Sequence, residues 1–137
     1  MRNQFLIGLA VAATIVFSYA QDGGAAEMGY APQASNEREV KVTAALQDTS
    51  SVAKTWDVEV VLETHTKALN DDLAKSAVLI ADGKQYTPSE WKGAPPGGHH
   101  RKGTLRFKAI VPRPAAVELQ IRLSGDPSPR SFKWLLK

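Results

Sequence analysis

Two of the three histidines in this 137-residue chain are adjacent, His99 and His100, and the third, His65, lies at the end of another expected strand. Imidazole is a common ligand of zinc and copper, and a zinc site takes three protein ligands when catalytic and four when structural. The three histidines would supply three ligands if the fold brings the two segments together. A carboxylate ligand is available nearby from Glu63, Asp71 or Asp72. The sequence therefore predicts His65, His99 and His100 as ligands of a metal ion, copper or zinc, or of another small ligand.

Three interpretations of the histidine pair remain open at this stage. In the first, His99 and His100 share a metal, which requires a bend because adjacent strand residues point to opposite faces. In the second, the pair and the following Arg101 and Lys102 bind an anion or an acidic partner, with glycine N–H groups as further donors. In the third, the histidines are structural, one bonding across strands and the other packing on Trp91, and no small ligand binds.

The histidine pair belongs to a segment, residues 91–103, that reads as a long inter-strand loop. Pro95-Pro96 favours an extended conformation, and glycine supplies backbone angles that other residues reach at a cost. We therefore expect five residues to shape the loop: Trp91, Gly93, Gly97, Gly98 and Gly103.

Apolar residues alternate with polar ones along most of the chain, as in strands with one buried face. Asp82-Gly83 suits the tight primed turn of a hairpin. A single helical turn is expected at residues 70–75, capped by Asn70 or Asp71. About seven short strands predict an all-β fold, an immunoglobulin-like antiparallel β-sandwich, with a small β-barrel as the alternative. The expected strands lie at residues 39–46, 56–63, 77–81, 84–87, 104–109, 117–123 and 132–136.

The N-terminus has the pattern of a secretory signal. Arg2 precedes the apolar run from Phe5 to Phe17, and Ser18-Tyr19-Ala20 is a small-x-small cleavage site. We expect residues 1–20 to be a signal peptide, 21–38 a flexible leader and 39–137 a single domain. The run is shorter than a membrane span of roughly 18 residues and no second one follows, so no transmembrane segment is expected after cleavage. The expected location is periplasmic or extracellular.

Composition and motifs exclude several classes of function. The net charge of +3, from 17 basic and 14 acidic residues, is too small to indicate a nucleic-acid partner, and the chain has no cysteine for disulfides. The sequence lacks a G-x-S-x-G nucleophile element, a phosphate-binding P-loop and an H-E-x-x-H helix. We therefore expect no enzyme.

Several of these residues resemble a known group of proteins. The order Trp91-x-Gly93, Pro96-Gly97-Gly98-His99-His100-Arg101-x-Gly103-x-Leu105-x-Phe107, together with Glu63-Thr64-His65, Leu119-x-Ile121-Arg122 and Phe132-x-Trp134, is similar to uncharacterised exported or envelope-anchored prokaryotic β-sandwich domains. The resemblance covers about residues 56–137. It implies export and the sandwich fold, and it singles out His65, His99, His100 and Arg101, but it implies no reaction and no ligand.

The sequence thus predicts an exported, non-catalytic binding module whose histidine-containing loop edge meets a metal ion or an acidic ligand. Its partner would be an unknown protein or a small anionic ligand. The alternative is a structural domain that makes envelope or partner contacts through a sheet edge or the leader, with structural histidines and no small ligand.

Overall fold

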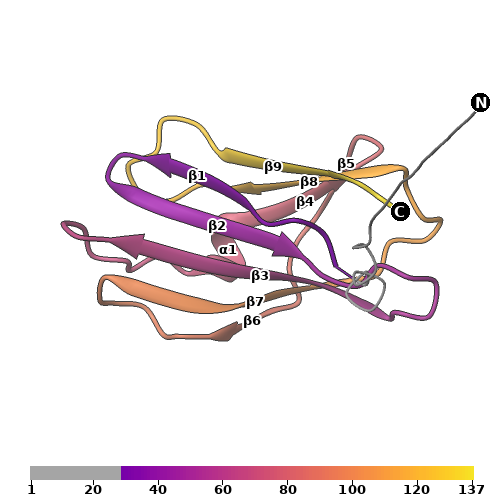
Figure 1. Ribbon diagram of the computed structural model, residues 1–137, viewed down its shortest axis with the longest axis horizontal. Helices are drawn as coiled ribbons and strands as arrows, with labels where there is room; N and C mark the ends of the chain where they lie inside the picture. Colours follow the sequence, from indigo (N-terminus) through magenta and orange to yellow (C-terminus); the bar gives the residue numbers. More distant parts are fainter. Residues whose placement is uncertain (1–28) are drawn as a thin grey trace, which may run out of the picture.

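Two antiparallel sheets make up the computed structural model, which describes residues 29–137 (Figure 1). The five-stranded sheet has the order β1-β2-β3-β7-β6, with β1 at Gln33–Glu37, β2 at Val40–Leu46, β3 at Thr55–Thr64, β7 at His100–Lys108 and β6 at Glu90–Gly93. The four-stranded sheet has the order β5-β4-β8-β9, with β5 at Lys84–Tyr86, β4 at Ala77–Ala81, β8 at Ala116–Ile121 and β9 at Arg130–Leu135. The predicted β-sandwich is confirmed, and neither sheet closes into the alternative barrel.

Strand periodicity explains which side chains form the core. In β2 every second residue from Val40 to Leu46 is buried, and β3 repeats this pattern from Trp56 to Thr64. Cross-strand register places Val42 opposite Leu62, so the buried side chains of neighbouring strands share one face. The inner faces of the two sheets meet in one apolar core that includes Trp56, Phe107, Leu119 and Phe132.

Nine strands are present among the described residues, against about seven predicted. The additional strands are β1, which lies inside the predicted flexible leader, and β6, which lies inside the predicted loop. The leader prediction is therefore wrong for residues 33–37. Both faces of β1 are at least partly exposed, so it lacks the apolar alternation that identifies a strand. The predicted signal peptide and residues 21–28 of the leader lie outside the described residues.

The β1–β2 turn also lacks the usual sequence of a hairpin. Arg38 and Glu39 have φ angles of 49° and 67°, the left-handed conformation that Asn-Gly adopts most easily in a primed turn. Buried Arg130 stabilises this strained turn from the opposite sheet, donating to the carbonyl oxygens of Val40 at 2.7 Å and Glu37 at 2.9 Å. Its charge is balanced by Asp126, whose Oδ2 lies 3.0 Å from Nε of Arg130.

The other turns agree more closely with the sequence. Asp82 and Gly83 have φ angles of 50° and 78° and join β4 to β5, as predicted. Helix α1, Leu73–Ser76, follows the predicted position, but its N-cap is Asp72 rather than Asn70 or Asp71, since the Asp72 carboxylate accepts from the N–H of Ala74. Among residues 29–137 no helix is long and apolar enough to cross a membrane.

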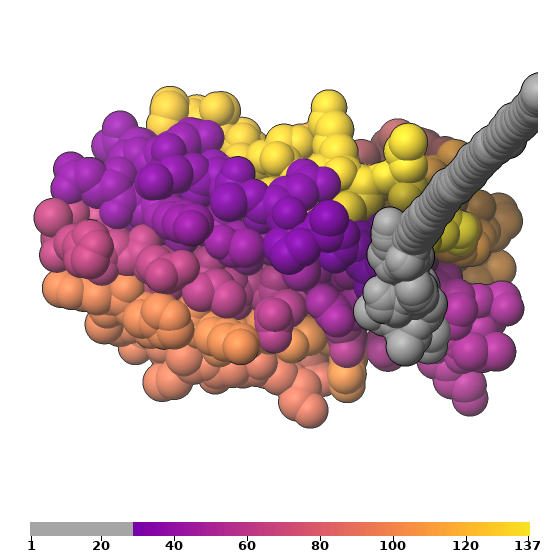
Figure 2. Space-filling model, in the orientation of Figure 1, coloured from indigo at the N-terminus to yellow at the C-terminus, as the bar shows by residue number. Residues whose placement is uncertain are grey.

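At one side of the sandwich, the side chain of Gln33 links β1 of one sheet to β9 of the other. Figure 2 shows the indigo strand β1 beside the yellow C-terminal strand β9, where the two sheets meet. The amide of Gln33 accepts from the N–H of Lys133 at 3.1 Å and donates to the carbonyl oxygen of the same residue. Gln33 therefore satisfies backbone groups at the free edge of β9.

Candidate functional site

The two segments that carry the histidines are joined by backbone hydrogen bonds. The N–H of Thr64 donates to the carbonyl oxygen of His99 at 3.0 Å. Beyond it, Leu69 N–H donates to Gly98 at 3.1 Å and Gly97 N–H donates to Leu69 at 2.7 Å. The fold therefore brings the His65 segment against the His99-His100 segment, as the prediction of a shared site requires.

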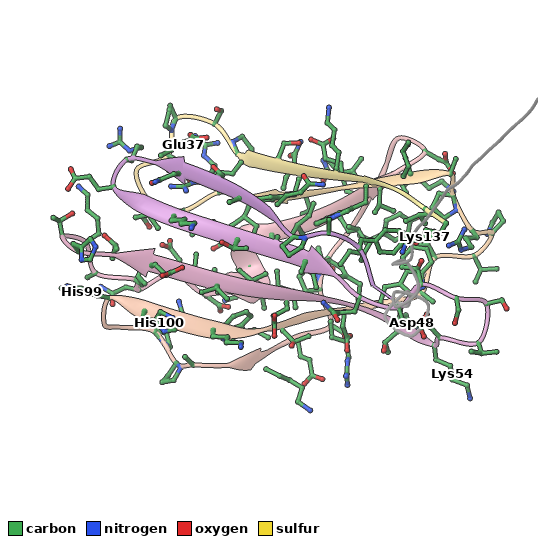
Figure 3. All side chains as sticks on the ribbon, in the orientation of Figure 1. Glu37, Asp48, Lys54, His99, His100 and Lys137 are labelled. Carbon is green, nitrogen blue, oxygen red and sulfur yellow. The ribbon has the colours of Figure 1, made fainter. Side chains whose placement is uncertain are left out.

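All three histidines line one hollow of about 420 Å³, which we call the histidine hollow. It is lined by Asn36, Glu39, Lys41, Glu63, Thr64, His65, His99 and His100. It lies at the end of the sandwich where Figure 3 labels His99 and His100, opposite the end that carries Lys54 and Lys137. We call this the histidine end.

The histidine rings are open to solvent. His65, His99 and His100 are all exposed, and no ring nitrogen of the three forms a hydrogen bond with another residue in the described range 29–137. A structural histidine would be expected to use its ring nitrogens internally. The described residues therefore give the interpretation of the histidines as structural no support, and it stays a prediction.

Strand register explains why one row of the outer sheet face forms part of the hollow. Asn36 of β1 pairs with Lys41 of β2, Lys41 pairs with Glu63 of β3, and Glu63 pairs with His100 of β7. These four side chains therefore lie side by side on the solvent face at the end of the sheet. With neutral imidazoles the hollow contains one cation, Lys41, and two carboxylates.

The β1–β2 turn is tied to the His65 segment. The buried hydroxyl of Thr64 donates to the carbonyl oxygen of Glu39 at 2.7 Å and accepts from the N–H groups of Thr66 and Lys67, each at 3.2 Å. The Thr66 hydroxyl in turn contacts the Glu39 carboxylate. Thr64 thus fixes the position of His65, which lies between two threonines that both contact the same turn.

The geometry does not favour the predicted copper or zinc site. Across the described residues, no group of three or more His, Cys, Asp or Glu side chains lies close enough to hold a metal ion. His100 projects from the outer face of β7 next to Glu63, whereas His99 precedes the strand. The three histidines therefore line the same hollow without forming a group that could hold a metal ion.

Arg101 has a different role from the predicted anion contact. Its side chain is only 1% exposed, and it donates to the carbonyl oxygens of Asp71 at 2.7 Å, Ala94 at 3.1 Å and Leu69 at 3.3 Å. The guanidinium carbon also lies 5.6 Å from the centroid of the Trp91 ring, within range of a cation–π contact. The prediction that Arg101 binds an external anion is wrong, because its donors face inward and connect the two loops.

Burial also affects the charge of Arg101. Desolvation lowers the pKa of its guanidinium below its ordinary value, while the carboxylates of Asp71 and Asp72 act in the opposite direction. Its Nε is buried and has no hydrogen-bond partner among residues 29–137. The parity of β7 predicts this placement: Arg101 shares a strand face with Leu105 and Phe107, which are core residues. Extending that alternation backwards would have identified Arg101 as an inward residue.

Lys102 lies outside the histidine hollow. Its ammonium is exposed and lies 3.8 Å from the carboxylate of Glu59, across the same sheet face. Farther along, Arg106 binds both carboxylate oxygens of Asp57 at 2.9 and 3.0 Å, which raises its pKa. Lys102 and Arg106 are thus paired with acidic side chains outside the histidine hollow, whereas Lys41 lines it.

The predicted loop-shaping residues divide into two groups. Gly93 and Gly103 form a cross-strand pair, and a Cβ atom on Gly103 would lie 2.7 Å from the Cα of Gly93 and from the Trp91 ring. Trp91 covers both glycines and donates from Nε1 to the Ala94 carbonyl oxygen at 2.9 Å. Gly97 and Gly98 instead adopt φ angles of 118° and 74° in open space. All five residues thus have a geometric role, but Gly93 and Gly103 act within a sheet, not within a loop.

Comparison with known proteins adds no relative. The sequence matches no family model, and no curated protein or solved structure matches it. The resemblance to exported β-sandwich domains therefore stays a prediction.

Proposed function

We propose that this protein is an exported, non-catalytic binding module whose histidine hollow binds an acidic ligand. One observation carries the proposal: three exposed imidazoles, without internal partners, come from two separate segments to line a single hollow. Imidazole, lysine and asparagine side chains there supply hydrogen-bond donors for a carboxylate.

The charge balance of the hollow makes the proposed binding dependent on pH. At neutral pH Lys41 faces the carboxylates of Glu39 and Glu63, while Asn36 and Thr64 carry no charge. Imidazole as a side-chain type gains a positive charge as pH falls below neutrality, which favours acidic ligands in a hollow lined by three imidazoles. We therefore expect acidic ligands to bind more tightly at pH 5.5 than at pH 7.5.

The same pH dependence separates an acidic ligand from a metal ion. Metal ligands must be deprotonated, so zinc or copper would bind more weakly at pH 5.5 than at pH 7.5. Titration calorimetry with a glutamate-containing peptide, with zinc and with copper at both pH values measures the two trends. The triple variant His65→Gln, His99→Gln and His100→Gln should abolish the acid-strengthened peptide binding. If titration of the wild-type protein with the peptide at pH 5.5 gives no heat of binding, the proposal is overturned.

The alternative of partner contacts through a sheet edge finds less support. Gln33 occupies backbone groups of the β9 edge, and β6 at the opposite side is short and flanked by Pro88 and Pro95. Covered or short edges and nearby prolines are the usual means by which sheets avoid pairing with other chains. The histidine hollow is therefore the stronger candidate for recognition.

A further inference from the structure

A second hollow lies beside the first at the histidine end. It has a volume of about 220 Å³, and we call it the cationic hollow. Beside apolar residues, its lining includes Arg38, Lys67, Asp71, Ser124, Gly125, Asp126 and Arg130. They come from the β1–β2 turn, the segment after β3 and the β8–β9 turn.

The acidic groups of this hollow already have partners. Asp126 accepts from the Arg130 guanidinium at 3.0 Å and from the N–H of Leu123 at 3.1 Å. Oδ1 of Asp71 accepts from both the hydroxyl, at 2.6 Å, and the N–H, at 3.1 Å, of Ser124. Both carboxylates are thus held by internal donors.

Arg38 and Lys67 have no such partners. Both side chains are exposed, and within residues 29–137 neither forms an ion pair or a side-chain hydrogen bond. The guanidinium of Arg38 lies next to Gly125, 3.6 Å from the position that a Cβ atom on this glycine would occupy. The Arg130–Asp126 pair is balanced, and Arg38 and Lys67 outnumber the remaining carboxylate of Asp71. The hollow is suited to one carboxylate-sized anion.

The two hollows are separated by very little chain. Arg38 lines the cationic hollow and the next residue, Glu39, lines the histidine hollow, and consecutive Cα atoms are about 3.8 Å apart. His65 and Lys67 divide between the hollows in the same way. A ligand that crosses the β1–β2 turn would therefore contact both.

We infer that the ligand is an acidic peptide segment carrying at least two carboxylates, one placed in each hollow; this rests on the proposed function. A peptide fits better than a densely charged phosphate polymer because Glu39 and Glu63 would repel phosphates but accept hydrogen bonds from peptide N–H groups. The carboxylate in the cationic hollow is bound at neutral pH as well, because arginine and lysine stay charged.

The test uses fluorescence anisotropy with labelled glycine-serine peptides. Each peptide contains either one glutamate or two glutamates that are adjacent or separated by one to three residues. At pH 5.5 the best two-glutamate peptide should bind the wild-type protein about tenfold more tightly than the one-glutamate peptide, equivalent to about 1.4 kcal/mol. The double variant Arg38→Gln and Lys67→Gln should remove this preference. The matched control, Lys54→Gln with Lys84→Gln, removes two exposed cations elsewhere and should retain it.

The outcomes separate this inference from the proposed function. If both peptides bind equally, or if the Arg38 and Lys67 variant keeps the preference, the two-site inference is wrong while acid-strengthened binding to the histidine hollow can stand. If inorganic polyphosphate binds more tightly than every peptide, a phosphate polymer replaces the peptide as ligand. Far-ultraviolet circular dichroism and melting curves of each variant confirm that it is folded, and the single variant Lys67→Gln provides a second measurement if the double variant is not.

Discussion

Single residues show why the same sequence segment contains both an exposed imidazole and a buried guanidinium. His100 and Arg101 are neighbours, yet the alternation of β7 sends the imidazole to solvent and the guanidinium into the protein. Arg101 reaches carbonyl oxygens on both histidine-bearing segments, so it positions His65 relative to His99 without contacting a ligand in the hollow.

Replacing Arg101 tests this positioning role. Arg101→Met leaves the carbonyl groups of Leu69, Asp71 and Ala94 without their buried donor, and we expect a loss of about 2–4 kcal/mol in the free energy of unfolding. Arg101→Lys should restore little, because an ammonium cannot reproduce the planar fork. Urea denaturation measures the loss, and hydrogen exchange should increase at residues 94–99. Unchanged exchange there would contradict the positioning role.

Gly103 and Gly97 allow a second test with single substitutions. Gly103→Ala places a methyl group 2.7 Å from the Gly93 backbone and the Trp91 ring, and such overpacking should destabilise the fold by about 1–3 kcal/mol. Gly97→Ala meets no atom, so its cost is the left-handed backbone alone, about 1 kcal/mol. Thermal melting compares the two variants. Adding Trp91→Ala to Gly103→Ala should relieve only part of the overpacking caused by the new methyl group, because the Gly93 backbone remains in contact with it.

At the level of secondary-structure elements, β1 and its turn depend on a charge in the opposite sheet. Asp126→Asn leaves Arg130 buried beside a neutral side chain, and loss of one partner of a buried ion pair costs about 3–5 kcal/mol. The β1–β2 hairpin should lose hydrogen-exchange protection first, since Arg130 binds its carbonyl groups. Simultaneous loss of protection in all strands would contradict this local role.

The contact between strands β8 and β9 should make the stability of the protein depend on pH. The Ser131 hydroxyl, and to a lesser extent the Gln120 amide, hydrogen-bond to the Glu118 carboxylate and lower its pKa from the ordinary 4.5. A carboxyl group with a lowered folded-state pKa stabilises the protein fully above about pH 4.5, and this contribution is lost as pH falls through the lower value. Ser131→Ala should therefore lower the melting temperature at pH 7 but have little effect near pH 2. A difference that persists unchanged at pH 2 would show that packing, not charge, is responsible.

For the whole molecule, the sequence was informative wherever alternation is strong. Six of the seven predicted strands are present because each buries an apolar face. The seventh, β5, has no buried residue and follows from the Asp82-Gly83 turn, whose residue types suit the backbone. β1 was missed since its pairing is supported by Gln33 and Arg130, contacts about 100 residues apart in the chain. The histidines were identified from sequence because their residue type and clustering suggest a site. Asn36, Glu39 and Lys41 could not be found in this way, because pairing between distant strands brings them to the hollow.

Export is a prediction about the whole molecule, because the proposed binding module would meet its ligand outside the cytoplasm. Signal peptidase requires small residues at the positions that Ser18 and Ala20 occupy, so we expect the secreted protein to begin at Gln21. Mass spectrometry of the protein expressed in a bacterial host, compared between periplasmic and membrane fractions, measures this. Ala20→Phe should block cleavage and retain the uncleaved chain at the membrane, whereas Asn3→Gln, outside the cleavage site, should be processed normally. Full-length protein in the cytoplasm of the wild-type strain would contradict export, and the acidic ligand would then have to be sought inside the cell.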